Sequence, residues 1–143
     1  MKRFFNITFA IIILVTAFAA GAQAEPTSQR VIANIPFAFT VNNKTLPAGK
    51  YTITVLNPSS DRKALQIRSM NGRFSAIVLT NAVLGNVSEN SKLVFERYDD
   101  RYFFAQAQIA GDSTTLAALR SNKEHKHLVA TAKKKSLVVI VAG

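Results

Sequence analysis

The sequence predicts a mainly all-β protein, built as an antiparallel β-sandwich or a partly open barrel of about seven strands with one short helix near the C-terminus. Apolar residues recur at every second position through most of the chain, which is typical of strands that bury one face. Short segments rich in asparagine, aspartate, glycine, proline and serine separate these runs, as turns between strands do.

The first strand is expected over residues 30–41, where apolar side chains share one face and Arg30, Asn34 and Thr40 share the other. Pro36 belongs to the outward set. Because proline cannot donate a hydrogen bond to a neighbouring strand, we expect this strand to lie at an edge or to be broken by a bulge there. The inward set consists of Val31, Ala33, Ile35, Phe37, Phe39 and Val41.

Three further strands are expected over residues 50–55, 65–68 and about 73–83. Asn71-Gly72 lies between the last two and favours a tight two-residue hairpin, because both residues tolerate positive φ. Residues 73–83 are apolar on both faces, so we expect a central strand that is covered on both sides.

A second hairpin is expected from strands over residues 92–98 and 101–110. In the returning strand, strict alternation places Phe103 on the side of Ala107 and Phe104 on the opposite side.

In the C-terminal part of the chain, the regular alternation of apolar and polar residues stops. Residues 116–119 fit a short helix or a strand, and both alternatives stay open. The spacing of Ser121 and Glu124 fits a capping box and predicts a helix over about residues 122–132. The β-branched run over residues 137–141 is expected as a buried last strand, in a sheet that the first strand also borders.

Residues 1–24 have the three parts of a secretory signal peptide. A cationic start at Lys2 and Arg3 precedes an apolar stretch, and an A-x-A motif ends at Ala24, so cleavage is expected between Ala24 and Glu25. An uncleaved anchor is the alternative, because residues 4–22 approach the roughly 20 residues that span a bilayer.

Cleavage would leave residues 25–143 as a single β domain, with a basic segment over residues 120–135 and a final strand over residues 136–142. We expect no transmembrane segment in it, and a periplasmic or secreted location. The chain has no cysteine, so neither disulfides nor a lipidated cysteine can stabilise or anchor it.

The chain is basic, since its 18 lysines and arginines exceed its 8 aspartates and glutamates by ten, and by eight without Lys2 and Arg3. Such a balance favours an anionic partner. For an exported protein this means an acidic or phosphorylated envelope or extracellular polymer, a lipid headgroup or extracellular nucleic acid, rather than genomic nucleic acid. Solvation alone is the alternative role. The candidate anion-binding residues are Arg120, Lys123, Lys126, Lys133, Lys134 and Lys135.

No motif predicts a catalytic residue, a metal site or a cofactor. The two histidines, His125 and His127, lie two positions apart in the expected helix and would point away from each other. Asp99-Asp100 is expected as a turn between strands. Tyr98 and Tyr102 flank that turn, either as exposed aromatic rings for ligand stacking or as packed cross-strand residues.

Four segments resemble those of a family of small exported bacterial β-rich proteins without assigned function. They are ANIPFAF (33–39), KTLPAGKY (44–51), AIVLTNA (76–82) and AGDST (110–114). The resemblance implies export and a shared β fold, and it brings no activity or site residues.

Three functions remain as hypotheses. The charge favours an exported, non-catalytic domain that binds an anionic polymer or envelope surface. The alternatives are a structural module that assembles through an edge strand, at Pro36 or at residues 137–141, and an enzyme of unknown class. The sequence leaves the oligomeric state open.

Overall fold

The computed structural model describes residues 29–120, 126, 130 and 134–142. The expected signal peptide, with its cleavage site at Ala24 and Glu25, lies outside the described residues. Of the helix expected over residues 122–132, only Lys126 and Ala130 are described, and both are exposed.

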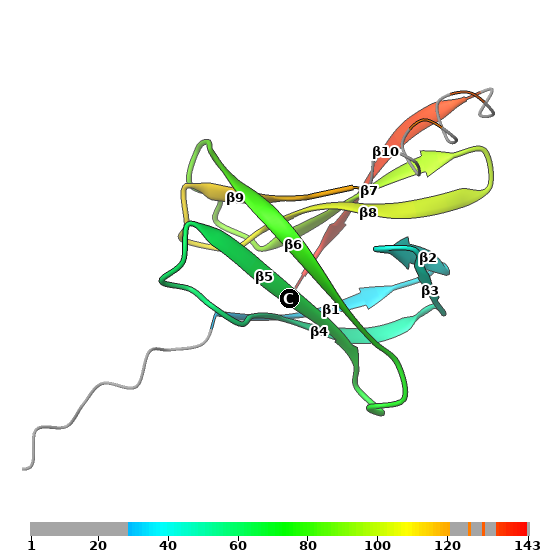
Figure 1. Ribbon diagram of the computed structural model, residues 1–143, viewed down its shortest axis with the longest axis horizontal. Helices are drawn as coiled ribbons and strands as arrows, with labels where there is room; N and C mark the ends of the chain where they lie inside the picture. Colours follow the sequence, from blue (N-terminus) through cyan, green and yellow to red (C-terminus); the bar gives the residue numbers. More distant parts are fainter. Residues whose placement is uncertain (1–28, 121–125, 127–129, 131–133, 143) are drawn as a thin grey trace, which may run out of the picture.

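The described chain is all-β, and its ten strands belong to one sheet (Figure 1). The expectation of about seven strands is wrong, because the first expected strand divides in two, residues 44–46 pair as a short strand, and residues 114–118 form a strand rather than a helix. The sandwich alternative is also wrong, since one hydrogen-bonded sheet contains every strand. The strands are β1 (Arg30–Ile35), β2 (Phe39–Val41), β3 (Lys44–Leu46), β4 (Gly49–Val55), β5 (Arg62–Ser69), β6 (Ser75–Leu84), β7 (Lys92–Tyr98), β8 (Arg101–Gln108), β9 (Thr114–Ala118) and β10 (Lys135–Val141).

The main path through the sheet is β10-β7-β8-β9-β6-β5-β4-β1, and all of its pairs are antiparallel. The β2–β3 hairpin joins this path through a short parallel pairing of β2 with β8. The sheet curls until its two outermost strands, β1 and β10, come near each other (Figure 1). No hydrogen-bonded pairing joins these two strands in the described chain, so the sheet is open along a β1–β10 seam.

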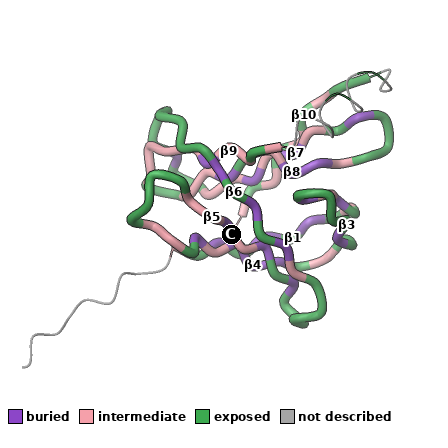
Figure 2. The backbone as a smooth tube through the Cα atoms, viewed as in Figure 1, coloured by how far each residue is buried: buried purple, intermediate pink, exposed green. Residues whose placement is uncertain are grey.

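One core fills the concave inner side of this sheet, because alternate side chains of each strand point to it. Figure 2 shows buried residues along the strands, and exposed residues at the turns and along parts of several strands. The largest fully buried side chains include Ile35, Phe39, Leu46, Tyr51, Leu65, Ile67, Leu93 and Phe95.

The prediction of an edge strand is confirmed for β1, and the chain at Pro36 forms the end of that strand rather than a bulge. β1 ends at Ile35, and the chain enters β2 only at Phe39. Phe37, between the two strands, is half-buried and stacks on Tyr102 with ring centroids 3.8 Å apart. The break lets the chain leave the β4 edge and pair with β8 on the other side of the core.

A β-bulge changes the predicted faces of β8. The pairing with β7 steps from Val94–Gln106 to Phe95–Phe104, so Ala105 has no partner of its own. Such an extra residue reverses the alternation beyond it. Phe104 therefore lies in the main core, whereas Phe103 forms a separate small cluster with Tyr98, and the expectation from strict alternation is wrong.

The β5–β6 hairpin is confirmed, but its predicted two-residue turn is wrong. The last paired residues are Arg68 and Ser75, and only Gly72 of the predicted dipeptide has a positive φ, of 74°. The Gly72 amide donates to the Ser69 carbonyl, and the Asn71 side chain accepts from the Arg73 amide at 3.0 Å. This asparagine side-chain bond stabilises a wider turn than the sequence suggested.

Two strands that the sequence predicts to be buried expose one face. On β6, Ile77 and Leu79 are each about half exposed, and on β10 Leu137 and Val139 are 64% and 52% exposed. The described chain has no second layer over the outer side of the sheet. β-branched and aliphatic residues favour strands whether or not a face is covered. The apolar sequences of β6 and β10 therefore predicted the strands correctly but their burial wrongly.

Candidate anion-binding groove

A groove runs over the outer face of β1, β4 and β5. Neighbouring strands place Arg30 opposite Thr54, Thr54 opposite Gln66, and Thr52 opposite Arg68. Because the inward positions alternate with these, their side chains share the outer face. The strand register therefore gathers polar residues that lie far apart in the sequence.

The groove has a volume of about 370 Å³ and contains no carboxylate among its described lining residues. It is bounded on one side by the β5–β6 turn. Its lining consists of Arg30, Thr52, Thr54, Gln66, Arg68, Ser69, Met70, Asn71 and Gly72.

The turn positions the Arg68 guanidinium. A Cβ atom added at Gly72 would lie 3.3 Å from Arg68 Nη2, so the guanidinium lies directly against this glycine. In the described chain, neither Arg30 nor Arg68 forms a salt bridge. Their charges and N–H donors are therefore available to a ligand.

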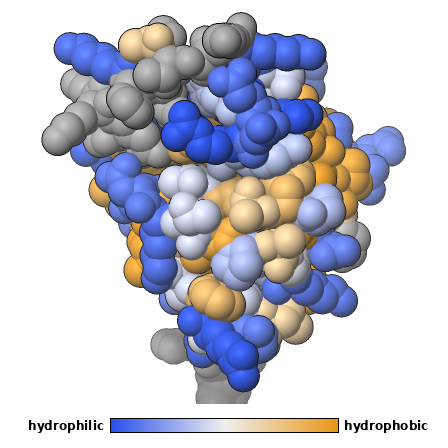
Figure 3. All heavy atoms as spheres, turned by 90° about the vertical axis from the view of Figure 1, so that its right-hand side faces the viewer, coloured by the Kyte–Doolittle hydropathy of each residue, from blue (hydrophilic) through white to orange (hydrophobic). Residues whose placement is uncertain are grey.

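An apolar depression of about 270 Å³ adjoins the groove across the β5–β6 turn. The two share Ser69, Met70 and Asn71, and the depression adds Pro47 and Phe74. Figure 3 shows apolar surface beside hydrophilic residues on the side of the molecule that lies to the right in Figure 1. Because Arg68 lines the groove and Pro47 and Phe74 line the depression, cationic and apolar residues meet at the β5–β6 turn.

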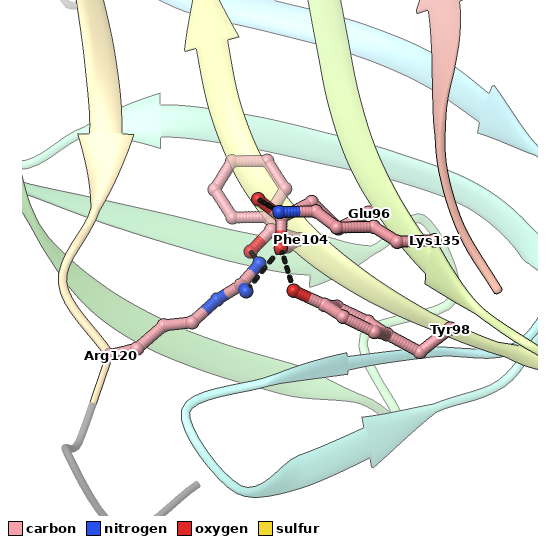
Figure 4. Close-up of polar contacts among 5 residues, drawn as sticks. All are labelled: Glu96, Tyr98, Phe104, Arg120 and Lys135. Atoms are coloured by element: carbon pink, nitrogen blue, oxygen red, sulfur yellow. Dashed lines mark hydrogen bonds and ion pairs between the residues drawn. The ribbon is translucent and has the colours of Figure 1, made fainter. Parts of the chain in front are cut away.

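Two of the predicted anion-binding residues instead contact a carboxylate of the protein itself (Figure 4). Arg120 Nη1 lies 2.5 Å from Glu96 Oε2, and Lys135 Nζ lies 3.5 Å from Glu96 Oε1. The Tyr98 hydroxyl donates to Glu96 at 2.9 Å, and Arg120 Nη2 donates to the Phe104 carbonyl at 3.4 Å. We call Glu96, Tyr98, Arg120 and Lys135 the Glu96 cluster.

The Glu96 carboxylate is stabilised in its ionised form. Burial opposes ionisation, but hydrogen bonds from Arg120 and Tyr98 and the positive charges of Arg120 and Lys135 outweigh it and lower the pKa of Glu96. The pKa of Lys135 is shifted in the opposite direction: the hydrogen bond with Tyr98 and the negative charge of Glu96 raise it. The cluster thus joins the segment after β9 to β7 and β10.

The other predicted cations are not gathered into one site by the described chain. The Lys134 amide donates to Asp99 Oδ1 at 3.3 Å, and Lys126 is exposed. Lys123 and Lys133 lie outside the described residues, as do His125 and His127.

The Asp99-Asp100 turn is confirmed, with Asp99 at a positive φ of 53°. Tyr98 is 2% exposed and packs edge-to-face on Phe103, so its interpretation as an exposed stacking ring is wrong. Tyr102 is half-buried against Phe37.

The groove could not be predicted from the sequence, because the sequence shows which face of a strand a residue occupies but not which strands are neighbours. Alternation identifies Arg30, Gln66 and Arg68 as outward-facing, but it cannot tell that β4 lies between β1 and β5. Only the order of the strands brings these side chains to one surface.

No protein-family model, curated protein or solved structure matches this chain. The resemblance to a family of small exported bacterial proteins therefore stays a prediction. In the described chain, no three histidine, cysteine, aspartate or glutamate residues are grouped so that they could hold a metal ion. The same residues include no helix with the length and apolarity needed to cross a membrane.

Proposed function

We propose that this chain is an exported, non-catalytic domain that binds an anionic component of the cell envelope or an extracellular polymer in the groove between Arg30 and Arg68. One observation carries the proposal: two arginines without salt-bridge partners line a groove whose described lining holds no acidic residue.

The groove suits the geometry of an anion. A guanidinium presents paired N–H donors that match the two oxygens of a carboxylate, phosphate or sulfate. Thr52 and Thr54 lie on β4 between the two arginines and can add hydroxyl donors. Since the site extends across three strands, it favours an elongated ligand or a surface with several anionic groups.

We propose binding rather than catalysis because of the chemical groups that line the groove. The described residues of the groove include no carboxylate, imidazole or thiol. A general acid or base, or an activated nucleophile, is normally built from one of these groups.

The decisive test is a titration of the exported chain with polyphosphate at low and high salt. The Arg68→Ala and Arg30→Ala variants should each bind about tenfold or more weakly, because a hydrogen bond to a charged group contributes roughly 1.5–3 kcal/mol. Arg101→Ala is the matched control, because Arg101 is an exposed strand arginine that does not line the groove.

The basic segment is tested in the same titration by replacing Lys133, Lys134 and Lys135 with alanine. Loss of binding in this variant alone would move the site from the groove to residues 120–135. Equal affinity of all variants and the wild type would refute a specific anion site.

Export itself is tested by the intact mass of the protein recovered outside the cytoplasm. We expect a chain that begins at Glu25. A full-length chain held in the membrane fraction would support the uncleaved anchor instead.

A second candidate is a module that assembles through an edge strand. In the described chain, β10 pairs only with β7 and β1 pairs only with β4, so each has one edge without a hydrogen-bonded strand. Mass that rises with concentration in light scattering, and falls when residues 137–141 are altered, would favour this candidate.

A further inference from the structure

The outer face of β6 carries an apolar stripe that no layer of the described chain covers. Ile77, Leu79 and Val83 point to the same side and are 50%, 51% and 52% exposed. Leu119 lies beside Leu79, because its amide donates to the Leu79 carbonyl, and it widens the apolar surface there. From residue 77 to residue 83 the stripe is roughly 20 Å long at the rise of a strand. Asn81 interrupts the stripe between Leu79 and Val83, so its contiguous apolar part is formed by Ile77, Leu79 and Leu119. Exposed apolar surface rimmed by polar residues marks an interaction site.

This stripe continues into the groove. Ile77 is paired with Gln66 and Leu79 with Ala64, so their side chains are direct neighbours on the same face. Gln66 and Arg68 belong to the groove lining. The stripe of β6 and the groove over β5, β4 and β1 thus form one surface, half apolar and half cationic.

Cations border the stripe along β5. Arg68 lies opposite Ser75 at one end and Arg62 lies opposite Asn81 farther along. The Lys44 ammonium donates to the Ser75 carbonyl at 2.6 Å and adds a third positive charge at the start of β6.

We infer that this surface docks on an anionic lipid bilayer, with phosphate groups of the lipid heads in the Arg30–Arg68 groove and the β6 stripe against the boundary of the acyl chains. The inference rests on the proposed function, because it uses the same groove and names its ligand. Exposed aliphatic residues beside cations are the pattern by which peripheral proteins bind anionic membranes.

The charges disfavour a second copy of the chain as the occupant. In a twofold dimer through this face, Arg62 and Arg68 of each copy would approach the same cationic surface of the other. Like charges placed across an interface oppose association, whereas an anionic bilayer neutralises them.

The experiment is co-sedimentation of the exported chain with vesicles of phosphatidylglycerol or of phosphatidylcholine. We expect binding to the first and much weaker binding to the second. The Ile77→Thr/Leu79→Thr variant should bind phosphatidylglycerol vesicles about tenfold more weakly, from the loss of buried apolar area. Threonine keeps the preference for strand, and both side chains point away from the core, so the fold should persist.

Leu137→Thr/Val139→Thr is the matched control, because it alters an equally exposed aliphatic stripe on β10. It should bind the vesicles as the wild type does. Soluble polyphosphate separates the two proposals: Ile77→Thr/Leu79→Thr should keep its polyphosphate affinity, whereas Arg68→Ala should lose affinity for both ligands.

Unchanged vesicle binding by Ile77→Thr/Leu79→Thr would overturn the lipid inference and leave the groove proposal standing. Unchanged polyphosphate binding by Arg68→Ala would overturn the groove proposal. A concentration-dependent mass that only Ile77→Thr/Leu79→Thr abolishes would assign the stripe to a second copy of the chain and overturn lipid docking.

Discussion

At the scale of single residues, Glu96 contributes to stability through the contacts of its side chain. Its carboxylate contacts groups from three parts of the chain: Tyr98 of β7, Arg120 after β9, and Lys135 of β10. Among the described strands, β10 pairs with β7 alone. Glu96 thus holds the end of an edge strand with a charged side-chain contact in addition to its backbone pairing.

Glu96→Gln should lower the free energy of unfolding by about 1–3 kcal/mol, because it removes the charge that Arg120 and Lys135 share. The Arg120 side chain is only 15% exposed, so water replaces its lost partner incompletely. Urea denaturation near neutral pH measures the change. Glu89→Gln, in an exposed loop, is the control and should unfold like the wild type.

Glu96 also predicts a dependence of stability on pH. Its folded-state pKa is lowered from 4.5, so its contribution is complete above about pH 4.5 and is lost as the pH falls through the folded-state value. The difference in unfolding free energy between wild type and Glu96→Gln should therefore shrink in acid. A difference that grows below pH 4.5 would contradict this assignment.

Gly72→Ala tests how the turn positions Arg68. A side chain at φ 74° is strained, and its Cβ would press on the Arg68 guanidinium. We expect a loss of about 1 kcal/mol in stability together with weaker polyphosphate binding. Gly111→Ala is the control, because φ there is 79° but a Cβ would meet nothing within 4 Å, so stability should fall without a change in binding.

At the scale of elements, the alternation of residues predicts the inward faces of β1, β4 and β5 well, since one buried face imposes period two on the sequence. The same logic fails in β8, where the unpaired Ala105 shifts the faces, because a bulge depends on the partner strand. The prediction of burial also fails for β6 and β10, because a run of apolar residues indicates a preference for strand but not what covers the outer face of that strand.

Leu65→Ala and Leu137→Ala make the difference between the two faces measurable. Leu65 is fully buried, so its truncation should lower the free energy of unfolding by about 2–5 kcal/mol. Leu137 is 64% exposed, so the same change should cost less than about 1 kcal/mol. Comparable losses in the two variants would mean that β10 is covered in solution.

At the scale of the whole molecule, the order of the strands in the sheet could not be predicted from the sequence. Adjacent strands such as β5 and β6 are joined by a short turn and could be predicted to pair. The contacts of β9 with β6 and of β2 with β8 link distant segments, and no local pattern specifies them. The groove depends on the pairing of β1 with β4, which the β2–β3 hairpin separates along the chain, so its residues could be assigned to a face but not to a site.

Amide hydrogen exchange should follow this order of strands. We expect the slowest exchange in β4 and β5, which have hydrogen-bonded neighbours on both sides, and faster exchange at the amides of β1 and β10 that face the β1–β10 seam. Protection of β10 equal to that of β5 would indicate that the seam closes by direct pairing.

The β1–β10 seam also bears on when this protein can fold. The strands that border it are the first and the last along the described chain, so the sheet stays unfinished until residues near position 141 have been made. Contacts between such distant segments form slowly, because a long loop must close first. For a chain that we propose to be exported, this delay is an advantage, because a secretion channel that threads unfolded polypeptide requires the complete sheet to form only after transport.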